Sequence, residues 1–158
     1  MARQILNRLT LVMSMMGLAL ASAVVANGQA RANLSAQVPF DFIVAGKDFR
    51  AGRYNVRAIN SAGGAILIST PDARDRVVTL TNGTGPNYGK DLPARLVFHR
   101  YGNTYFLSQI WMAGEMTGHE LQKSPRERAA ERELKTVASN HNSRTARYEV
   151  VEVLAMVR

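Results

Sequence analysis

The sequence predicts a mainly β fold, a small antiparallel barrel or sandwich with one amphipathic helix near the C-terminus. Three observations support this prediction. Apolar residues recur at every second position in several short segments, which is the period of a half-buried strand. Clusters of glycine, proline and asparagine separate these segments, as turns do in all-β domains. Helical periodicity is convincing only over residues 124–138.

The first 30 residues are expected to be a secretory signal peptide. Arg3 and Arg8 lie in a basic head, an apolar stretch runs from Leu9 to about Ala26, and small residues close it. The alternative is an uncleaved membrane anchor, because about eighteen apolar residues are near the lower limit for a membrane span. We therefore expect export to the periplasm or the extracellular space. The remainder, residues 31–158, is expected to be a single β-rich domain with no integral membrane span after signal cleavage.

Length and composition narrow the function classes. The chain of 158 residues suits one domain with a core. It contains no cysteine, which excludes disulfides, thiol catalysis and zinc–thiolate sites. The formal net charge of +8 favours contact with polyanions or an anionic surface, although a soluble protein with a basic isoelectric point is the alternative.

Two strands are predicted at the start of the domain. Apolar residues alternate from Val38 to Val44, and Pro39, which lacks a backbone donor, places the beginning of this strand or makes it an edge strand. A turn over residues 45–48 leads to a second alternating segment over residues 51–59.

Further strands and a polar loop follow. A turn cluster at residues 60–64 precedes a short apolar run, residues 65–70, that suits a strand buried on both faces. Residues 71–75 are expected to form a turn, and the β-branched residues 76–81 predict a further strand. The polar stretch from Asn82 to Pro93 is the most suitable place for a ligand-binding loop, because loops vary while a sheet stays fixed.

A β-hairpin is predicted over Arg95–Trp111, with Gly102 and Asn103 as a two-residue turn, since both tolerate positive φ. The predicted cross-strand pairs are Val97–Ser108, Phe98–Leu107, His99–Phe106 and Arg100–Tyr105. Strict alternation places Tyr105, Leu107, Gln109 and Trp111 on one face and Phe106, Ser108 and Ile110 on the other. Cross-strand packing explains the aromatic density of this segment, and a binding platform is the alternative.

The C-terminal part predicts a helix and a closing strand. Ser124 is suited to the N-cap, Pro125 to the first helical position, and Glu127 to a capping box. An apolar stripe continues to residue 138. A strand is expected over residues 146–157, and its pairing with the first strand would hide two vulnerable edges.

Three segments carry a resemblance. They are VPFDFIVAGKDFRAGRYNV (residues 38–56), LVFHRYGNTYFLSQIW (96–111) and KSPRERAAEREL (123–134). In this order, behind a signal peptide, they resemble a group of small exported bacterial β-rich proteins of unassigned function. The resemblance implies export and a β-rich domain, and it supplies no catalytic residues.

No catalytic, metal or cofactor motif is expected. The stretch GTGPNYGKD (83–91) lacks the first glycine, the Ser/Thr and the following helix of a phosphate loop. His99, His119 and His141 lie in three separate segments, so they do not form a clustered metal site. There is no G-x-S-x-G elbow for a serine nucleophile.

The favoured function is therefore an exported, non-enzymatic binding or structural module of the cell envelope that contacts an anionic polymer or a partner protein. Nucleic acid is not expected, because the compartment outside the inner membrane holds little of it. The candidate ligand-facing residues combine basic, aromatic and loop positions: Arg95, His99, Arg100, Tyr101, Tyr105, Asn87, Tyr88 and Lys90. The alternative is a small extracytoplasmic hydrolase that uses His99 or His119 as its base.

Overall fold

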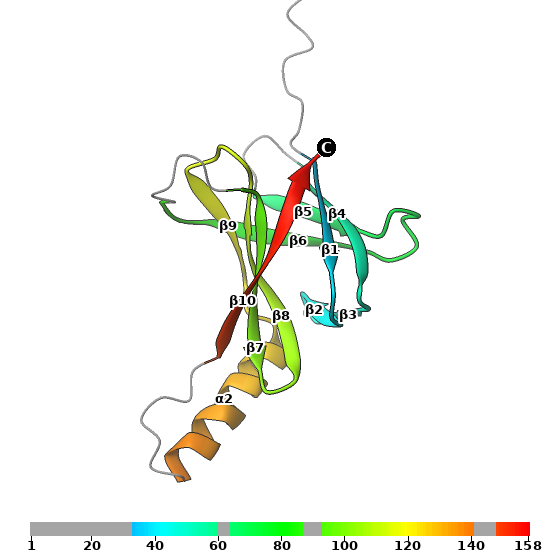
Figure 1. Cartoon of the computed structure of the whole chain (residues 1–158). Coiled ribbons are helices and arrows are strands. Elements are labelled where there is room, and N and C mark those ends of the chain that lie inside the picture. Colours follow the sequence, from blue (N-terminus) through cyan, green and yellow to red (C-terminus); the bar gives the residue numbers. More distant parts are fainter. Residues whose placement is uncertain (1–32, 60–63, 87–92, 141–147) are drawn as a thin grey trace, which may run out of the picture. The chain divides into compact units, whose positions relative to one another are not determined.

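A computed structural model describes residues 33–59, 64–86, 93–140 and 148–158, so the predicted signal peptide lies outside the described residues. This part of the chain forms ten strands and one helix, α2 (Pro125–Asn140) (Figure 1). The strands are β1 (Asn33–Val38), β2 (Phe42–Val44), β3 (Lys47–Phe49), β4 (Gly52–Ala58), β5 (Ala65–Ser69), β6 (Arg76–Pro86), β7 (Arg95–Tyr101), β8 (Thr104–Trp111), β9 (Thr117–Leu121) and β10 (Glu149–Val157).

Eight of the strands close into an antiparallel barrel in the order β1, β4, β5, β6, β9, β8, β7 and β10. The mainly β prediction is confirmed, and the structure decides for a barrel over a sandwich. The last strand pairs with β1, through Leu34–Val157, Ser35–Met156 and Ala36–Ala155, whereas Phe42–Val44, part of the predicted first strand, pairs with β3 and β8. Closure leaves each of these eight strands a partner on both sides.

Strands β2 and β3 form a small hairpin attached to β8. Strand β2 runs parallel to the first half of β8, whereas β9 pairs with its second half. The prediction of one strand from Val38 to Val44 was wrong, because the chain leaves β1 at Pro39, which has no N–H to donate, and resumes at Phe42. The β2–β3 turn is formed by Ala45 and Gly46, which both have positive φ.

The barrel interior is filled by aliphatic and aromatic side chains. Phe98 is fully buried, and its ring meets those of Phe40 and Phe42 edge-on, with centroids 5.2 and 5.4 Å apart. Tyr105 stacks on Phe40 at 3.9 Å. Part of the aromatic density of the β7–β8 hairpin is thus core packing, which is worth more than buried area alone.

The β7–β8 hairpin has the predicted register up to Phe98–Leu107, and Tyr101–Thr104 closes a two-residue turn. Gly102 has a positive φ of 60° and Asn103 does not, the pattern of a type II′ turn. The predicted Val97–Ser108 pair was wrong, because Ser108 is the extra residue of a β-bulge and Val97 pairs with Gln109.

The bulge changes which side chains face the core. Beyond Ser108, Ile110 joins Leu107 in the barrel interior, and Trp111 moves to the outer face. The strict alternation predicted for the return strand therefore fails at this point. A single inserted residue reverses every later side chain of the strand.

Two other expectations were corrected, and one strand had not been predicted. Strand β5 is not buried on both faces, because only Ile66 and Ile68 point into the barrel. Strand β6 extends to Pro86 and takes the first five residues of the predicted loop, whose residues 87–92 lie outside the described part. Strand β9 was not predicted, since its sequence TGHEL has little of the usual β-branched character.

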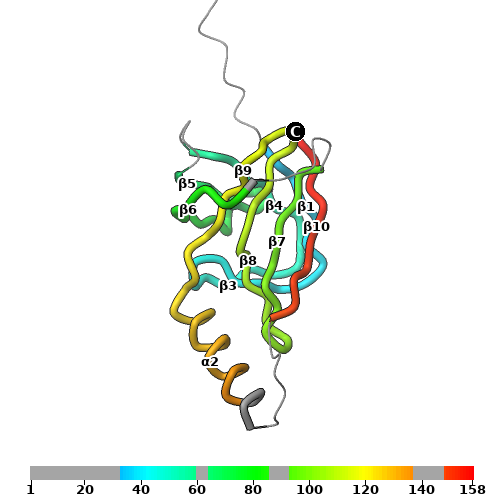
Figure 2. Tube along the Cα trace, turned by 90° about the vertical axis from the view of Figure 1, so that its left-hand side faces the viewer, coloured from blue at the N-terminus to red at the C-terminus, as the bar shows by residue number. Residues whose placement is uncertain are grey.

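Helix α2 begins where the sequence predicts and ends two residues later. The Ser124 hydroxyl accepts the Glu127 N–H at 3.2 Å, which confirms the N-cap. The helix packs through Ala130 and Leu134 on a cluster of Ile43, Tyr101, Phe106 and Tyr148, beside β7 and β8 (Figure 2). Within the described residues, no helix has the length and apolar character that a membrane span requires.

Candidate functional site

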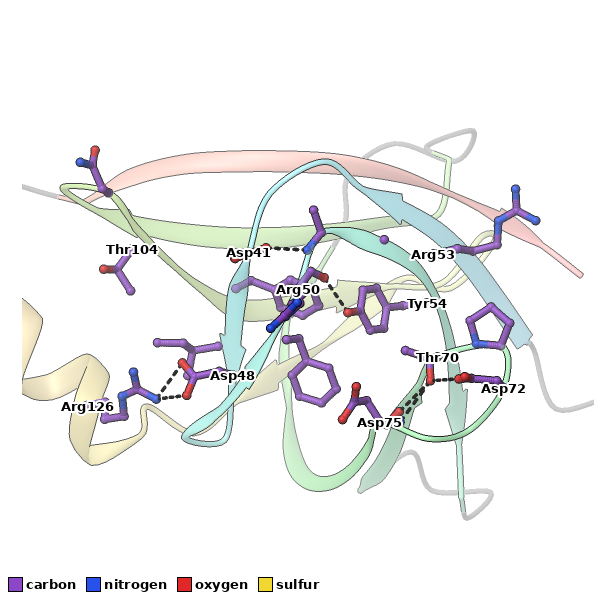
Figure 3. Close-up of a pocket in the computed structure, with 17 residues that line it drawn as sticks. Asp41, Asp48, Arg50, Arg53, Tyr54, Thr70, Asp72, Asp75, Thr104 and Arg126 are labelled. Carbon is purple, nitrogen blue, oxygen red and sulfur yellow. Dashed lines mark hydrogen bonds and ion pairs between the residues drawn. The ribbon is translucent and has the colours of Figure 1, made fainter.

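A groove of about 1000 Å³ lies between the β2–β3 hairpin, the β3–β4 and β5–β6 turns and the tip of the β7–β8 hairpin (Figure 3). Its lining is strongly charged. Four aspartates, Asp41, Asp48, Asp72 and Asp75, and three arginines, Arg50, Arg53 and Arg126, contribute to it. Its chemistry depends on which of these charges already have partners within the protein.

Two of the carboxylates hold the turns that form the groove. Asp41 accepts the Ala51 N–H at 2.7 Å, and so ties the start of β2 to the turn before β4. Asp48 accepts two hydrogen bonds from Arg126, at 2.8 and 2.9 Å, and so links β3 to helix α2. These hydrogen bonds lower the pKa of Asp48 from its ordinary value, so the carboxylate is ionised at neutral pH.

The other two carboxylates belong to the β5–β6 turn. Asp72 accepts hydrogen bonds from the Thr70 hydroxyl and the Arg74 N–H, and the first of these is the main reason that its pKa is lowered. Asp75 forms an ion pair with Lys47 at 3.3 Å. Each aspartate of the groove therefore has an internal partner.

Arg50 and Arg53 differ from the aspartates in this respect. Arg50 lies within the groove and Arg53 at its margin (Figure 3), and both side chains are exposed. Among the described residues, neither guanidinium has a hydrogen-bond or ion-pair partner. The groove thus offers two free cations, each with a planar array of N–H donors.

The backbone at Arg50 is held in place by Tyr54. The Tyr54 ring is buried against Phe42 and Phe49, and its hydroxyl donates to the Arg50 carbonyl oxygen at 2.6 Å. Burial raises the pKa of Tyr54, so the hydroxyl remains a donor at neutral pH. The turn that presents Arg50 is therefore anchored directly to the aromatic core.

The sequence-predicted residues lie elsewhere. Arg95 is on the outer face of β7, where its guanidinium carbon lies 5.0 Å from the centroid of the Trp111 ring. Its Nε is 3.4 Å from Glu152 Oε1, an ion pair without hydrogen-bond geometry. Arg95 therefore covers the only tryptophan of the chain.

His99 and Tyr101 are buried between β7 and helix α2. His99 Nδ1 lies 3.2 Å from Glu127 Oε1, and the Tyr101 hydroxyl donates to the same oxygen at 3.5 Å. The ring of Tyr148 stacks on His99 with centroids 3.8 Å apart. Burial and the nearby Glu127 carboxylate raise the pKa of Tyr101 well above its ordinary value. This cluster joins the helix to the barrel.

Arg100 and Tyr105 lie together on the opposite face of the hairpin. The Arg100 guanidinium is 5.4 Å from the Tyr105 ring centroid and donates to Glu149 at 3.0 Å. The structure thus brings together Arg100 with Tyr105 and His99 with Tyr101, but not all five candidates of the hairpin. Asn87, Tyr88 and Lys90 lie outside the described residues.

The two histidines of the alternative hydrolase hypothesis face structural partners. His119 Nε2 is 3.4 Å from Glu115, and His99 pairs with Glu127. Neither histidine lines the groove, and within the described ranges neither is hydrogen-bonded to a hydroxyl nucleophile. The same ranges contain no group of three or more side chains able to hold a metal ion.

Sequence reasoning missed the groove because its residues come from turns. Asp72 and Asp75 were assigned to a turn segment, and Arg50 lay between the predicted turn over residues 45–48 and the predicted strand over residues 51–59, so none of these charges showed a periodicity. The one usable signal was the alternation of Arg53 with Tyr54, which predicts that an arginine faces outward where the tyrosine faces the core.

No protein-family model matches the chain, and comparison with curated proteins and with solved structures finds no similar protein. The functional argument therefore rests on the geometry of the groove. Its central feature is a pair of free guanidinium groups, Arg50 and Arg53, beside four aspartates that already have partners.

Proposed function

We propose that this protein is an exported, non-enzymatic binding module of the cell envelope that holds an anionic polymer at the groove through Arg50 and Arg53. The observation that carries the proposal is the difference in hydrogen-bond and ion-pair partners between the aspartates and the two arginines of the groove. The four aspartates are engaged within the protein, whereas these two guanidinium groups have no partner among the described residues.

The chemistry of arginine narrows the ligand. A guanidinium presents a planar fork of donors that matches carboxylate, phosphate or sulfate groups two bonds at a time. Both side chains are solvent-exposed, so each contact is screened by water and contributes little alone. A chain of repeated anionic groups compensates through multivalency, because a second contact forms at high effective concentration. A polymer fits this site better than a single small anion.

The export half of the proposal is supported by the sequence. The basic head with Arg3 and Arg8, and the apolar stretch after it, are typical of a secretory leader. A cysteine-free barrel needs no oxidative folding step after export. Residues 31–158, which carry a formal net charge of +6 without Arg3 and Arg8, add a general attraction to anionic polymers of the envelope.

Binding of the full chain to an immobilised carboxylated polysaccharide tests the groove. The probe is polygalacturonate, with polyphosphate as a second anionic probe and neutral dextran as the control ligand. The variant Arg50→Gln/Arg53→Gln removes both free guanidiniums. Its matched control, Arg128→Gln/Arg132→Gln, removes the same charge from two exposed residues of helix α2.

We expect the groove variant to bind polygalacturonate at least about tenfold more weakly than the unmodified chain, which corresponds to roughly 0.7 kcal/mol for each arginine. The helix variant should lose less than about twofold. Binding should also collapse at about 1 M salt, where the screening length is only about 3 Å. Equal losses in the two variants, or binding that survives high salt, would contradict a groove built on free arginines.

A further inference from the structure

A second surface lies on the outer wall of β4, β5 and β6, away from helix α2 (Figures 1 and 2). Pairing register brings its side chains into adjacent rows. Arg57, Leu67 and Val78 are cross-strand neighbours in one row, and Ala65 and Leu80 follow in the next, where Ile59 donates its N–H to Ala65. Arg76 lies at the end of the preceding row, opposite Ser69.

This wall, defined by Arg57, Arg76, Ile59, Leu67, Val78 and Leu80, presents aliphatic side chains to solvent. Val78 is 56% exposed and Leu80 is 67% exposed. Such side chains are normal when scattered, but here they are cross-strand and diagonal neighbours. An exposed apolar cluster rimmed by polar groups marks an interaction site.

The charges of the wall are of one sign. Arg57 and Arg76 are exposed, and no described residue offers either side chain a hydrogen bond or an ion pair. The outward positions of β1, β4, β5 and β6, all within the described residues, include no aspartate or glutamate. Asp72 and Asp75 of the β5–β6 turn are paired with Arg74 and Lys47, and Glu120 of β9, opposite Asn82, lies beyond the Leu80 end of the wall.

A second apolar wall shows that charge is the deciding difference. Strand β10 exposes Val150, Leu154 and Met156, but it also carries Glu149 and Glu152. Glu152 lies on the same face as these aliphatic side chains and forms an ion pair with Arg95, so that wall is close to neutral, whereas Glu149 pairs with Arg100 on the other face of the strand. Of these two walls, the β4–β5–β6 wall alone combines exposed aliphatic side chains with cations that have no partner among the described residues.

We infer that the β4–β5–β6 wall docks on the surface of an anionic lipid bilayer. The guanidinium groups of Arg57 and Arg76 would contact the headgroup phosphates, and Val78 and Leu80 would enter the headgroup–acyl boundary. Basic and apolar side chains of peripheral membrane proteins bind bilayers in this way. A partner protein is the less favoured occupant, because the anchor side chains of a partner would need pockets on this wall to insert into. None of the four aliphatic residues lines the groove or the smaller cavity beside Leu134.

Vesicle flotation with the full chain tests this inference. The vesicles contain three parts phosphatidylcholine to one part phosphatidylglycerol, and vesicles of phosphatidylcholine alone are the control. Two variants probe the wall, Arg57→Gln/Arg76→Gln and Val78→Ser/Leu80→Ser. The matched aliphatic control is Val150→Ser/Leu154→Ser on β10, since Val150 and Leu154 are 54% and 67% exposed. All proteins share residues 1–30, so any contribution of that segment cancels in the comparison.

We expect the bound fraction on anionic vesicles to exceed that on neutral vesicles by at least about tenfold. The arginine variant should lose about 25-fold in partitioning, roughly fivefold for each charge. The aliphatic wall variant should lose severalfold, and the β10 control should bind as the unmodified chain does. Equal binding to both vesicle types, or equal losses in the two serine variants, would overturn the inference.

The result is separable from that for the groove. Arg50→Gln, which leaves the outward-facing Arg53 and Arg57 of β4 in place, should leave vesicle binding within about threefold, whereas it weakens polygalacturonate binding. Circular dichroism of each variant shows whether the barrel remains folded. Loss of vesicle binding in a folded wall variant therefore supports the bilayer contact whether or not the groove binds polymer.

Discussion

Alanine at Gly118 tests how the barrel closes between β8 and β9. Gly118 lies beneath the indole of Trp111, and a Cβ atom at this position would stand 2.7 Å from Cδ2 and 2.8 Å from Cε2 and Cε3. The indole is only 8% exposed, and its Nε1 donates to Gln109 at 3.1 Å. The guanidinium of Arg95 packs over the ring at 5.0 Å. The ring therefore cannot move aside without losing contacts.

The magnitude follows from two opposing effects. Forcing extra volume into a packed site costs about 1–3 kcal/mol. Replacing glycine by alanine also restricts the unfolded chain, which stabilises the folded state by about 0.4–1 kcal/mol. We therefore expect Gly118→Ala to lower the free energy of unfolding by about 1–2 kcal/mol, and Tm by about 3–10 °C.

Urea denaturation followed by Trp111 fluorescence measures the loss. Gly85→Ala in β6 is the control, because no heavy atom lies within 4 Å of a Cβ built there. It carries the same entropy change without the contact. Trp111→Phe in the Gly118→Ala background, followed by circular dichroism, should cost less than the two single changes together. If Gly118→Ala is as stable as Gly85→Ala, the packing of Trp111 on β9 is refuted.

Three further predictions concern the core and the helix. Phe98→Ala should lower the free energy of unfolding by about 3–5 kcal/mol, because the ring is fully buried; a loss below about 1 kcal/mol in urea titration contradicts this core. Glu127→Ala should lower the free energy of unfolding by about 1–3 kcal/mol, since it leaves His99 and Tyr101 without their acceptor. Glu127→Gln, which keeps an oxygen, should lower it less, and equal losses in the two variants count against the helix–barrel cluster. Hydrogen bonds from Lys123 and Lys135 lower the pKa of Glu131 to about 2, from 4.5. The ionised carboxylate therefore contributes its full share to the free energy of unfolding above about pH 4.5, and this contribution is lost as the pH falls to about 2. Lys135 is exposed and Lys123 is half-buried, so Glu131→Gln should lower the free energy of unfolding by less than about 1 kcal/mol at neutral pH and flatten its pH dependence in that window. Parallel pH curves for the variant and the unmodified chain exclude the effect.

The fold class could be predicted from the sequence because one face of the barrel sheet is exposed to solvent and the other is buried. Alternation along β4 reflects a sheet whose inner side is buried, and the Ser124 cap follows from an equally local rule. The number and bounds of the strands were less accessible. Pro39 splits a continuous apolar alternation, and the Ser108 bulge reverses the face of Trp111. Neither event changes the local composition.

The candidate site shows the stronger limit. Basic and aromatic residues of β7 and β8 attracted attention because they are dense in the sequence, but each of them has an internal partner in the fold. Arg50 and Arg53 differ from these residues only because their side chains have no partner among the described residues. Whether a charge is paired depends on residues distant in the chain, such as Arg126 for Asp48, and no local pattern reports it.

Titration of the isotope-labelled full chain with polygalacturonate, followed by NMR of the arginine side chains and the indole, tests the central claim most directly. The account predicts that the Nε–H signals of Arg50 and Arg53 shift together and saturably. The signals of Arg95, Arg100 and the Trp111 indole should stay in place. Shifts at Arg95, Arg100 and Trp111, with none at Arg50 and Arg53, would contradict the groove as the binding site.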